Sequence, residues 1–281
     1  MSINIHVINT GYFKLDGGAM FGVVPKSIWS KTNPSDNNNM CSWSMRCLLV
    51  ETDNKKILID TGIGNKQSDK FFRYFYLHGD DTLLNSLALL SISPSEITHV
   101  LFTHLHFDHC GGAIRKNNNK LELVFPNAIH LSNEAHWKLA NNPNDREKAS
   151  FLKENFNLIQ KENKLKFIKQ GRLFKFMDID FYDGHTEAQM IPKIKYKDKK
   201  IIFMADLLPS IGHIPLPYVM GYDTQPLITL KEKSEFLNEA ADKQYILFLQ
   251  HDYQYECCTV RHTNKGIRLD KCGKLSQFLT F

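Results

Sequence analysis

Short apolar runs alternate with polar stretches along the chain, and several of these runs have the length and composition of β-strands. INIHVIN (3–9), MRCLLVE (45–51) and KKILIDTG (55–62) are apolar segments bounded by polar turn residues. The last two are separated only by the polar turn TDN. We therefore predict three strands near the start of the chain, the last two joined as a hairpin.

The next segment, DTLLNSLALL (81–90), has apolar residues at helical spacing and is predicted as a helix. SPSE (93–96) has the capping-box pattern with a proline at the first helical position. THVLFTH (98–104) then reads as a buried strand. Further on, AIHLSN (128–133) is expected as a strand that leads into a helix at NEAHWKLA (133–140).

The segment DREKASFLKENFNLIQKEN (145–163) is predicted as one long helix. Its apolar positions are Phe151, Leu152, Phe156 and Ile159. Together with the helix before it, this segment forms a predicted helical insert near 133–163.

The second half of the chain continues the alternation. MIPKIKYKDKKIIFMAD (190–206) is predicted as a hairpin that turns at KDKK, and KEKSEFLNEAADK (231–243) as a helix. YILFLQ (245–250) and CCTVRH (257–262) read as strands before a last short helix. No repeat or linker divides the chain, so we expect one α/β domain over residues 1–281, with sheets in the middle and helices outside.

Composition agrees with a globular protein. The chain has 281 residues, of which 42% are hydrophobic, enough for a sizeable core. A net charge of +5 is mild, and the lysines are mixed with acidic and apolar residues, so we expect no nucleic-acid partner. The first residues lack the features of a secretory signal and no run approaches a membrane span, which favours a cytoplasmic location away from membranes. The six scattered cysteines are expected to be reduced thiols.

The chemistry is concentrated in THLHFDHCGG (103–112). His104 and His106 are two positions apart, so on extended backbone they face the same side and can bind one metal ion. Asp108 and His109 follow after the chain turns and can bind a second ion. Two glycines then permit a close backbone approach. One buried imidazole already needs a specific partner, and a cluster of three is better explained by metal than by stability.

Three later residues complete the predicted set of metal ligands. Asp206 and His251 each follow directly after an apolar strand-like run, and His185 follows DIDFYDG. The ends of neighbouring strands meet at one edge of a sheet, where α/β proteins place their ligand sites. Imidazole and carboxylate suit zinc, with manganese, iron or cobalt as alternatives. The predicted ligands are His104, His106 and His185 for one zinc ion, Asp108, His109 and His251 for a second, and Asp206 as a bridge. Two such ions can share a hydroxide that acts as the nucleophile.

This ligand set resembles that of the metallo-β-lactamase superfamily, whose pattern HxHxDH is met by residues 104–109. The resemblance covers nearly the whole chain and implies an αββα sandwich of two mixed sheets flanked by helices, with a dinuclear site at one edge. True β-lactamases of this fold lack the bridging aspartate, and flavodiiron proteins carry an acid in place of the second histidine, so both activities are disfavoured. The segments 125–152, 204–210 and 213–226 resemble the branch that contains quorum-quenching N-acyl-homoserine lactonases, particularly the YtnP-like lactonases, and organophosphate hydrolases.

The resemblance implies a metal-dependent hydrolase that opens the lactone ring of N-acyl-homoserine lactones or related lactones and esters. Asp108 is expected to move the proton. The lactonase branch has a carbonyl-polarising tyrosine three residues after the bridging aspartate, and here that position is Pro209. Tyr218 or Tyr222 is the candidate replacement, with simple packing as the alternative.

Loops must shape the site for a small-molecule substrate. The glycine-punctuated segment 16–29 and the loop 208–222 could wall an apolar groove for an acyl chain. The candidates are Met20, Phe21, Trp29, Ile214 and Leu216, with core or dimer packing as the alternative. The aromatic segment FFRYFYLHG (71–79) could likewise line a pocket or bury the interface of a homodimer.

Other functions stay open on the same residues. A phosphotriester or phosphodiester hydrolase, or a thioesterase of the glyoxalase II type, would use the same metals. A nuclease should also show clustered basic residues, which the sequence lacks. A metal-binding protein without enzymatic activity is the least favoured, because the ligand set leaves room for water and substrate.

Overall fold

The computed structural model describes residues 2–279, which form two compact units that each contain one large sheet. The first unit consists of the chain up to Gly11 and of Met45–Lys169, and the second of Tyr12–Ser44 and of the chain from Gln170 onward. Each unit is therefore built from two separate segments of the sequence. The expectation of one domain over the whole chain stays a prediction.

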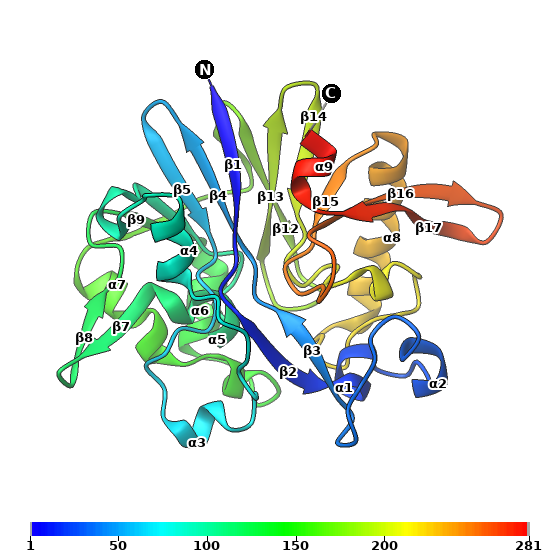
Figure 1. Cartoon of the computed structure of the whole chain (residues 1–281), viewed down its shortest axis with the longest axis horizontal. Helices are drawn as coiled ribbons and strands as arrows, with labels where there is room; N and C mark the ends of the chain where they lie inside the picture. The colour runs from blue at the N-terminus through cyan, green and yellow to red at the C-terminus, as the bar shows by residue number, and fades with distance from the viewer. Residues whose placement is uncertain (1, 280–281) are drawn as a thin grey trace. The chain divides into compact units, whose positions relative to one another are not determined.

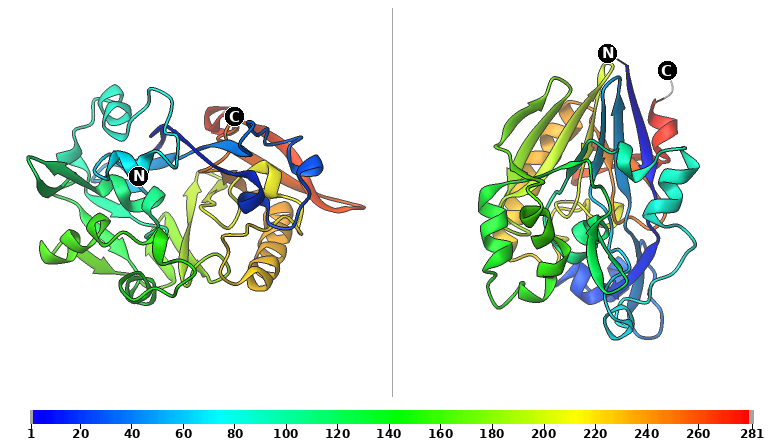
Figure 2. Two further views of the ribbon diagram at one scale, coloured as in Figure 1. Left: turned by 90° about the horizontal axis from the view of Figure 1, so that it is seen from below. Right: turned by 90° about the vertical axis from the view of Figure 1, so that its left-hand side faces the viewer.

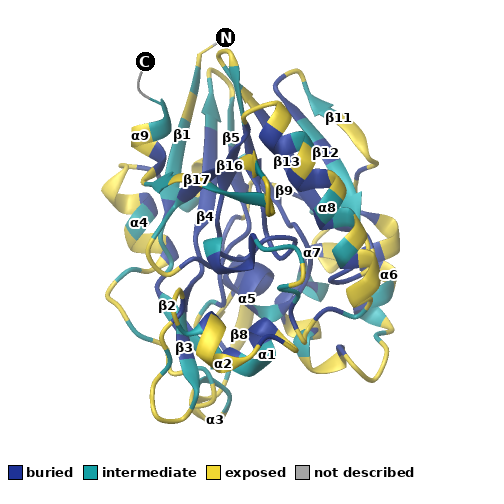
Figure 3. Ribbon diagram, turned by 90° about the vertical axis from the view of Figure 1, so that its right-hand side faces the viewer, coloured by how far each residue is buried: buried dark blue, intermediate teal, exposed yellow. Residues whose placement is uncertain are grey.

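The sheet of the first unit has six strands and is mixed (Figure 1). In spatial order they are β1 (Ile3–Ile8), β4 (Cys47–Thr52), β5 (Lys55–Ile59), β6 (His99–Leu101), β9 (Ile129–Ser132) and β10 (Leu165–Phe167). β1, β4 and β5 are antiparallel neighbours, whereas β5, β6, β9 and β10 run parallel. The predicted strands at 3–9, 45–51 and 55–62 are confirmed, and most of β4 is buried (Figure 3).

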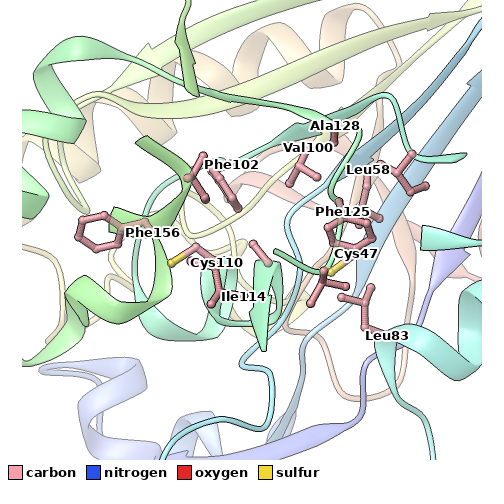
Figure 4. Packing of buried hydrophobic residues seen from close by; sticks show 14 of the residues in the cluster. Cys47, Leu58, Leu83, Val100, Phe102, Cys110, Ile114, Phe125, Ala128 and Phe156 are labelled. Atoms are coloured by element: carbon pink, nitrogen blue, oxygen red, sulfur yellow. The ribbon is translucent and has the colours of Figure 1, made fainter. Parts of the chain in front are cut away.

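Short helices and one small hairpin complete the first unit. They are α3 (Asp69–Phe72), α4 (Leu83–Leu89), α5 (Phe107–Cys110), α6 (Glu134–Asn141), α7 (Asn157–Lys161) and the hairpin of β7 (Ile114–Asn117) with β8 (Lys120–Leu123). Leu83 and Leu87 of α4 join a buried cluster with Leu58 of β5 and Phe102 after β6. Figure 4 shows Leu83, Leu58 and Phe102 in this cluster. The capping box predicted at 93–96 is present in a 3₁₀ turn, Pro94–Glu96.

The long helix predicted over 145–163 is wrong. The segment instead contains two 3₁₀ turns, Lys148–Ser150 and Lys153–Asn155, followed by α7. Phe151 and Phe156 are both buried. On one continuous helix, two residues five positions apart would point in directions that differ by about 140°. Because the helix is interrupted, both rings can enter the core.

The sheet of the second unit has seven strands. In spatial order they are β11 (Gly171–Phe174), β12 (Met177–Tyr182), β13 (Gln189–Tyr196), β14 (Lys199–Phe203), β15 (Ile246–Phe248), β16 (Cys257–Thr263) and β17 (Gly266–Gly273). Only β14 and β15 are parallel neighbours, so this sheet is also mixed. The predicted hairpin over 190–206 is confirmed as β13–β14, and β16–β17 extends as a long ribbon (Figure 2).

One long helix, α8 (Pro226–Asp242), packs beside β16 and exposes its outer side (Figure 3). It begins earlier than the predicted residue 231, with Pro226 at its first turn, where proline is favoured. The predicted last short helix is α9 (Leu275–Leu279). None of the helices within residues 2–279 combines the length and the apolar content needed to cross a bilayer. All six cysteines lie in this range, and none of them forms a disulfide bond there, in line with the prediction of reduced thiols.

The glycine-punctuated segment 16–29 contains two short helices between the paired strands β2 (Tyr12–Asp16) and β3 (Met40–Ser44). They are α1 (Gly17–Phe21) and α2 (Lys26–Trp29). The Asp16 carboxylate caps α1 by accepting the Ala19 N–H at 2.8 Å. A Cβ on Gly17 would lie 2.3 Å from the Trp29 ring, so the two helices pack closely only because this residue is glycine.

Candidate metal centre

The first unit places all four residues of the HxHxDH motif together at the end of β6. The chain leaves β6, passes through His104 and enters the one-turn helix α5, with His106 at its N-cap. The ring centroid of His104 lies 4.5 Å from that of His106 and 3.8 Å from that of His109. Asp108 Oδ2 lies 3.6 Å from His109 Nε2, and all four side chains are buried.

Two of these histidines are oriented by the same carboxylate. Asp60 Oδ2 accepts hydrogen bonds from His109 Nδ1 at 2.9 Å and from the Thr103 hydroxyl at 2.7 Å. Because that hydroxyl donates to Asp60, it accepts from His104 Nδ1, which lies 3.1 Å away. Both imidazoles therefore carry their proton on Nδ1, which leaves the Nε2 lone pair available for a metal ion.

The glycines after the motif act by allowing close approach. A Cβ on Gly111 would lie 2.1 Å from the Ile63 carbonyl oxygen, and one on Gly112 would lie 2.1 Å from the Thr61 carbonyl oxygen. The loop after β5 thus runs against the motif, and the Thr61 N–H donates to the His109 carbonyl at 2.7 Å. The predicted close backbone approach is confirmed.

The helical insert holds the motif from another side. Leu105 lies between the first two histidines of the motif. Its N–H donates to Nε2 of His136 on α6 at 2.9 Å. Glu147 Oε2 lies 3.7 Å from His106 Nε2, and the Phe151 ring lies 4.8 Å from the His106 ring. The insert therefore hydrogen-bonds the backbone of the motif and packs beside the His106 ring.

The second unit brings the other three predicted ligands together. Asp206, which follows β14, directs Oδ2 at His185 Nε2 and Oδ1 at His251 Nε2, each at 3.0 Å. The Asp206 N–H donates to the Gln189 side chain at 3.0 Å, which helps to fix the aspartate. One carboxylate thus faces two imidazole nitrogens through its two separate oxygens.

The opposite nitrogen of each of these imidazoles is also engaged. His251 Nδ1 lies 2.7 Å from the Ser44 carbonyl oxygen, which can only accept, so this nitrogen carries the proton. His185 Nδ1 lies 2.9 Å from Asp223 Oδ1. This arrangement again presents Nε2 as the ligand atom.

The charges in the second unit favour a cation at this point. Burial alone would lower the pKa of His185, but the Asp206 and Asp223 carboxylates outweigh burial and raise that pKa to about 10. Buried imidazoles and carboxylates in each unit are the donor types that zinc and other divalent transition metals prefer. The residues present therefore fit divalent metal ions.

The predicted substrate residues of segment 16–29 lie in a packed region of the second unit. Met20, Phe21 and Trp29 are almost fully buried. The Phe21 ring stacks on Trp29 at 5.4 Å and on His213 at 4.4 Å between centroids. Such packing agrees with the alternative given for these residues, which was core packing. A contact with substrate stays a prediction.

The loop residues are more varied in exposure. Ile214 is buried, Leu216 is half-buried, and both line a pocket of about 420 Å³ together with α8 and the β16–β17 hairpin. Tyr218 is half-buried, whereas Tyr222 is exposed. A catalytic role for either tyrosine stays a prediction.

The residues that orient the ligands were not predicted from the sequence, namely Asp60, Asp223 and Ser44 through its carbonyl group. One of them carried a usable signal. Asp60 directly follows the strand KKILI, much as Asp206 follows KKIIFMA. Ser44 acts through its backbone, for which no side-chain pattern exists.

Comparison with known proteins identifies the family. A family model described as the Metallo-beta-lactamase superfamily matches residues 46–251. The chain therefore belongs to the metallo-β-lactamase superfamily, and the predicted fold class, mixed α/β with mixed sheets and flanking helices, is confirmed.

Individual relatives add detail. N-acyl homoserine lactonase AiiA of Bacillus thuringiensis subsp. kurstaki is 29% identical over 96 residues, which cover 31% of this chain and 37% of that protein. The match thus spans little more than a third of that relative's length. The crystal structure of a probable metal-dependent hydrolase from Staphylococcus aureus has a TM-score of 0.88 and 31% identity, and covers 96% of each chain. AidC, a dizinc quorum-quenching lactonase in complex with a product, has a TM-score of 0.79 over 95% of this chain and 94% of its own, and its 23% identity shows a shared fold alone.

Proposed function

We propose that this chain is a metal-dependent hydrolase that binds two zinc ions and opens the lactone ring of N-acyl-homoserine lactones or related lactones and esters. The superfamily match supports the hydrolase class, and the relatives described as lactonases support the substrate class. Manganese, iron or cobalt could replace zinc on the same donors. A cytoplasmic location and a homodimer also stay predictions.

The observation that carries this proposal is the position of Asp206 relative to His185 and His251. Each carboxylate oxygen faces an Nε2 whose opposite nitrogen is already hydrogen-bonded. A carboxylate with this arrangement can bind one cation through each oxygen. The proposed ligand sets are His104, His106 and His185 for one ion, Asp108, His109 and His251 for the other, and Asp206 for both. The order of these residues along the chain matches the order of the ligands in the superfamily pattern, which supports this assignment.

Bound divalent cations would supply polarisation of the substrate carbonyl and an attacking water of lowered pKa. The residues of the chain would position the reactants and move the proton. We propose that Asp108 accepts a proton from the attacking water, whose oxygen forms a bond to the carbonyl carbon. When the ring C–O bond breaks, Asp108 delivers that proton to the departing oxygen, and the product is a hydroxy acid.

The substrate wall is proposed to come from the segment 16–29 and the loop 208–222. Leu216 is a partly accessible apolar candidate, and Tyr218 or Tyr222 is the candidate for the carbonyl-polarising role that Pro209 cannot fill. The other candidates are buried and would act by shaping these loops: Met20, Phe21, Trp29 and Ile214.

A substrate panel on zinc-loaded protein tests the proposal. The panel compares acyl-homoserine lactones of several chain lengths with a paraoxon-type phosphotriester, S-lactoylglutathione and a β-lactam, followed by product formation. We expect the lactones to be the preferred substrates. Preference for the phosphotriester or the thioester would favour those alternatives, and inertness to all of them would favour a non-enzymatic metal-binding role.

A further inference from the structure

Lys233 on α8 is a buried lysine whose ammonium group binds backbone carbonyls. It is 1% exposed, and Nζ donates to the carbonyl oxygens of His213 at 2.9 Å, Pro215 at 3.3 Å and Tyr218 at 2.7 Å. Three acceptors match the three hydrogens of one ammonium group. Burial lowers the pKa of Lys233 to about 7, and the Asp223 carboxylate opposes part of that shift.

These carbonyls belong to the loop proposed as a substrate wall. The loop leaves the 3₁₀ turn Ile211–His213 and has no strand or helix of its own before α8. The hydrogen bonds of the Lys233 ammonium run to three carbonyl oxygens of this loop. A charged group buried in the protein interior is costly unless it is fully hydrogen-bonded. The buried ammonium therefore needs these carbonyl oxygens as acceptors, and we expect it to maintain the loop conformation that supplies them.

The neighbouring residue, Glu232, holds a different loop. Its Oε1 accepts the Asp183 N–H at 2.7 Å and its Oε2 accepts the Gly184 N–H at 3.0 Å, directly before His185. The same loop approaches α8 closely, because a Cβ on Gly184 would lie 2.3 Å from the Thr229 hydroxyl oxygen. Successive residues on a helix point about 100° apart, so one turn of α8 reaches both loops.

We propose that Glu232 and Lys233 are positioning residues with separate effects: Glu232 fixes the loop that carries His185, and Lys233 fixes the 213–218 loop and thereby determines substrate selectivity. The part concerning selectivity rests on the proposed lactonase function. The part concerning loop positioning does not depend on which substrate is used.

The test compares Glu232→Gln and Lys233→Met with the matched controls Glu235→Gln and Lys231→Met, whose side chains are exposed on the same helix. Each protein is assayed for zinc affinity by chelator competition, for amide hydrogen exchange, and for kcat and KM across lactone chain lengths. Glutamine has only one oxygen for two N–H donors, so Glu232→Gln should weaken zinc binding about tenfold, in the range of outer-shell effects. Exchange should rise at residues 183–184.

Lys233→Met should keep zinc affinity within about threefold of the wild type. Exchange should rise at the backbone N–H groups of the 213–218 loop, such as those of Ile214 and Tyr218. KM and chain-length preference should change more than kcat. The controls should match the wild type. If Lys233→Met does not fold, Lys233→Gln, which keeps one donor group, should show the same pattern to a smaller degree.

Two results would overturn the proposal. One is unchanged exchange in both loops, and the other is an equal loss of zinc affinity in both variants, which would indicate general destabilisation. Failure of the substrate proposal would be visible separately, because an inert wild type would still show the divergent exchange and zinc-binding effects.

Discussion

Asp60 Oδ2 lies 2.9 Å from His109 Nδ1, and both side chains are fully buried. The same carboxylate accepts the Thr103 N–H at 2.8 Å through Oδ1. It therefore orients an imidazole and anchors the backbone at the start of the motif. Asp60 itself has φ near +59°, a conformation that aspartate and asparagine tolerate better than most residues.

Asp60→Asn should preserve the fold and weaken metal binding. Asparagine tolerates the same backbone conformation and nearly the same volume, but its amide nitrogen cannot accept the hydrogen bond from His109 or Thr103. Loss of such an outer-shell carboxylate typically lowers metal affinity about 10- to 100-fold. Zinc affinity by chelator competition, with the exposed Asp53→Asn as the control, measures this effect. Wild-type affinity in Asp60→Asn would show that the carboxylate does not orient a ligand.

Glu147→Gln tests the contribution of the insert. Asn144 donates to Glu147 Oε1 at 2.6 Å and so holds the carboxylate near His106. Replacing the charged oxygen by an amide should weaken zinc binding about tenfold while leaving thermal stability of the zinc-free protein little changed. The exposed Glu162→Gln is the control. Equal zinc affinity in both variants would mean that His106 is oriented by packing against Phe151 alone.

The motif could be predicted from sequence because its ligands are close neighbours in the chain. The groups that orient them could not, because they come from distant positions: Asp60 is 49 residues from His109, and Ser44 is 207 residues from His251. These pairings depend on which strands lie side by side. Spacing along the chain carries no direct record of that.

The fold was predictable where strands are buried and apolar, as in β4 and β5. The exposed hairpin β7–β8 was missed because IRKN and KLEL lack a continuous apolar run. The long helix predicted over 145–163 is wrong because Phe151 and Phe156 do not share one helical face, yet both are buried. Tertiary packing outweighs helix propensity in this segment.

The buried Lys66 predicts a pH-dependent stability. Its ammonium donates to the Gly111 carbonyl oxygen, and burial lowers its pKa from 10.5 to about 8. Between about pH 8 and 10.5 the unfolded state binds more protons than the folded state, so this residue makes the free energy of unfolding rise with pH. Relative to Lys66→Met, the wild type should gain up to about 3 kcal/mol across this range, from roughly 2.5 pKa units at 1.36 kcal/mol each.

Chemical denaturation at several pH values, with chelator present, measures this difference. Lys70→Met, which changes an exposed lysine of α3 and keeps Lys66, should follow the wild type throughout. A constant difference between the wild type and Lys66→Met across the range would contradict the burial of a charged lysine at this position.

Asp108→Asn tests the proposed proton transfer. Asparagine keeps a ligand oxygen but cannot accept and release a proton near neutral pH, so lactone turnover should fall about 10²- to 10⁴-fold at equal metal content. Metal content must be measured in the same samples, since Asp108 is also a proposed ligand. Unchanged turnover in fully loaded protein would rule out the proton-transfer role.

Metal analysis combined with lactone hydrolysis tests the central claim most directly. We expect the purified, zinc-loaded chain to hold two equivalents of metal, to hydrolyse an acyl-homoserine lactone, and to lose and regain that activity on chelation and reconstitution. Retention of full lactonase activity by metal-free protein, or binding of a single ion that no substitution at Asp206 disturbs, would contradict it.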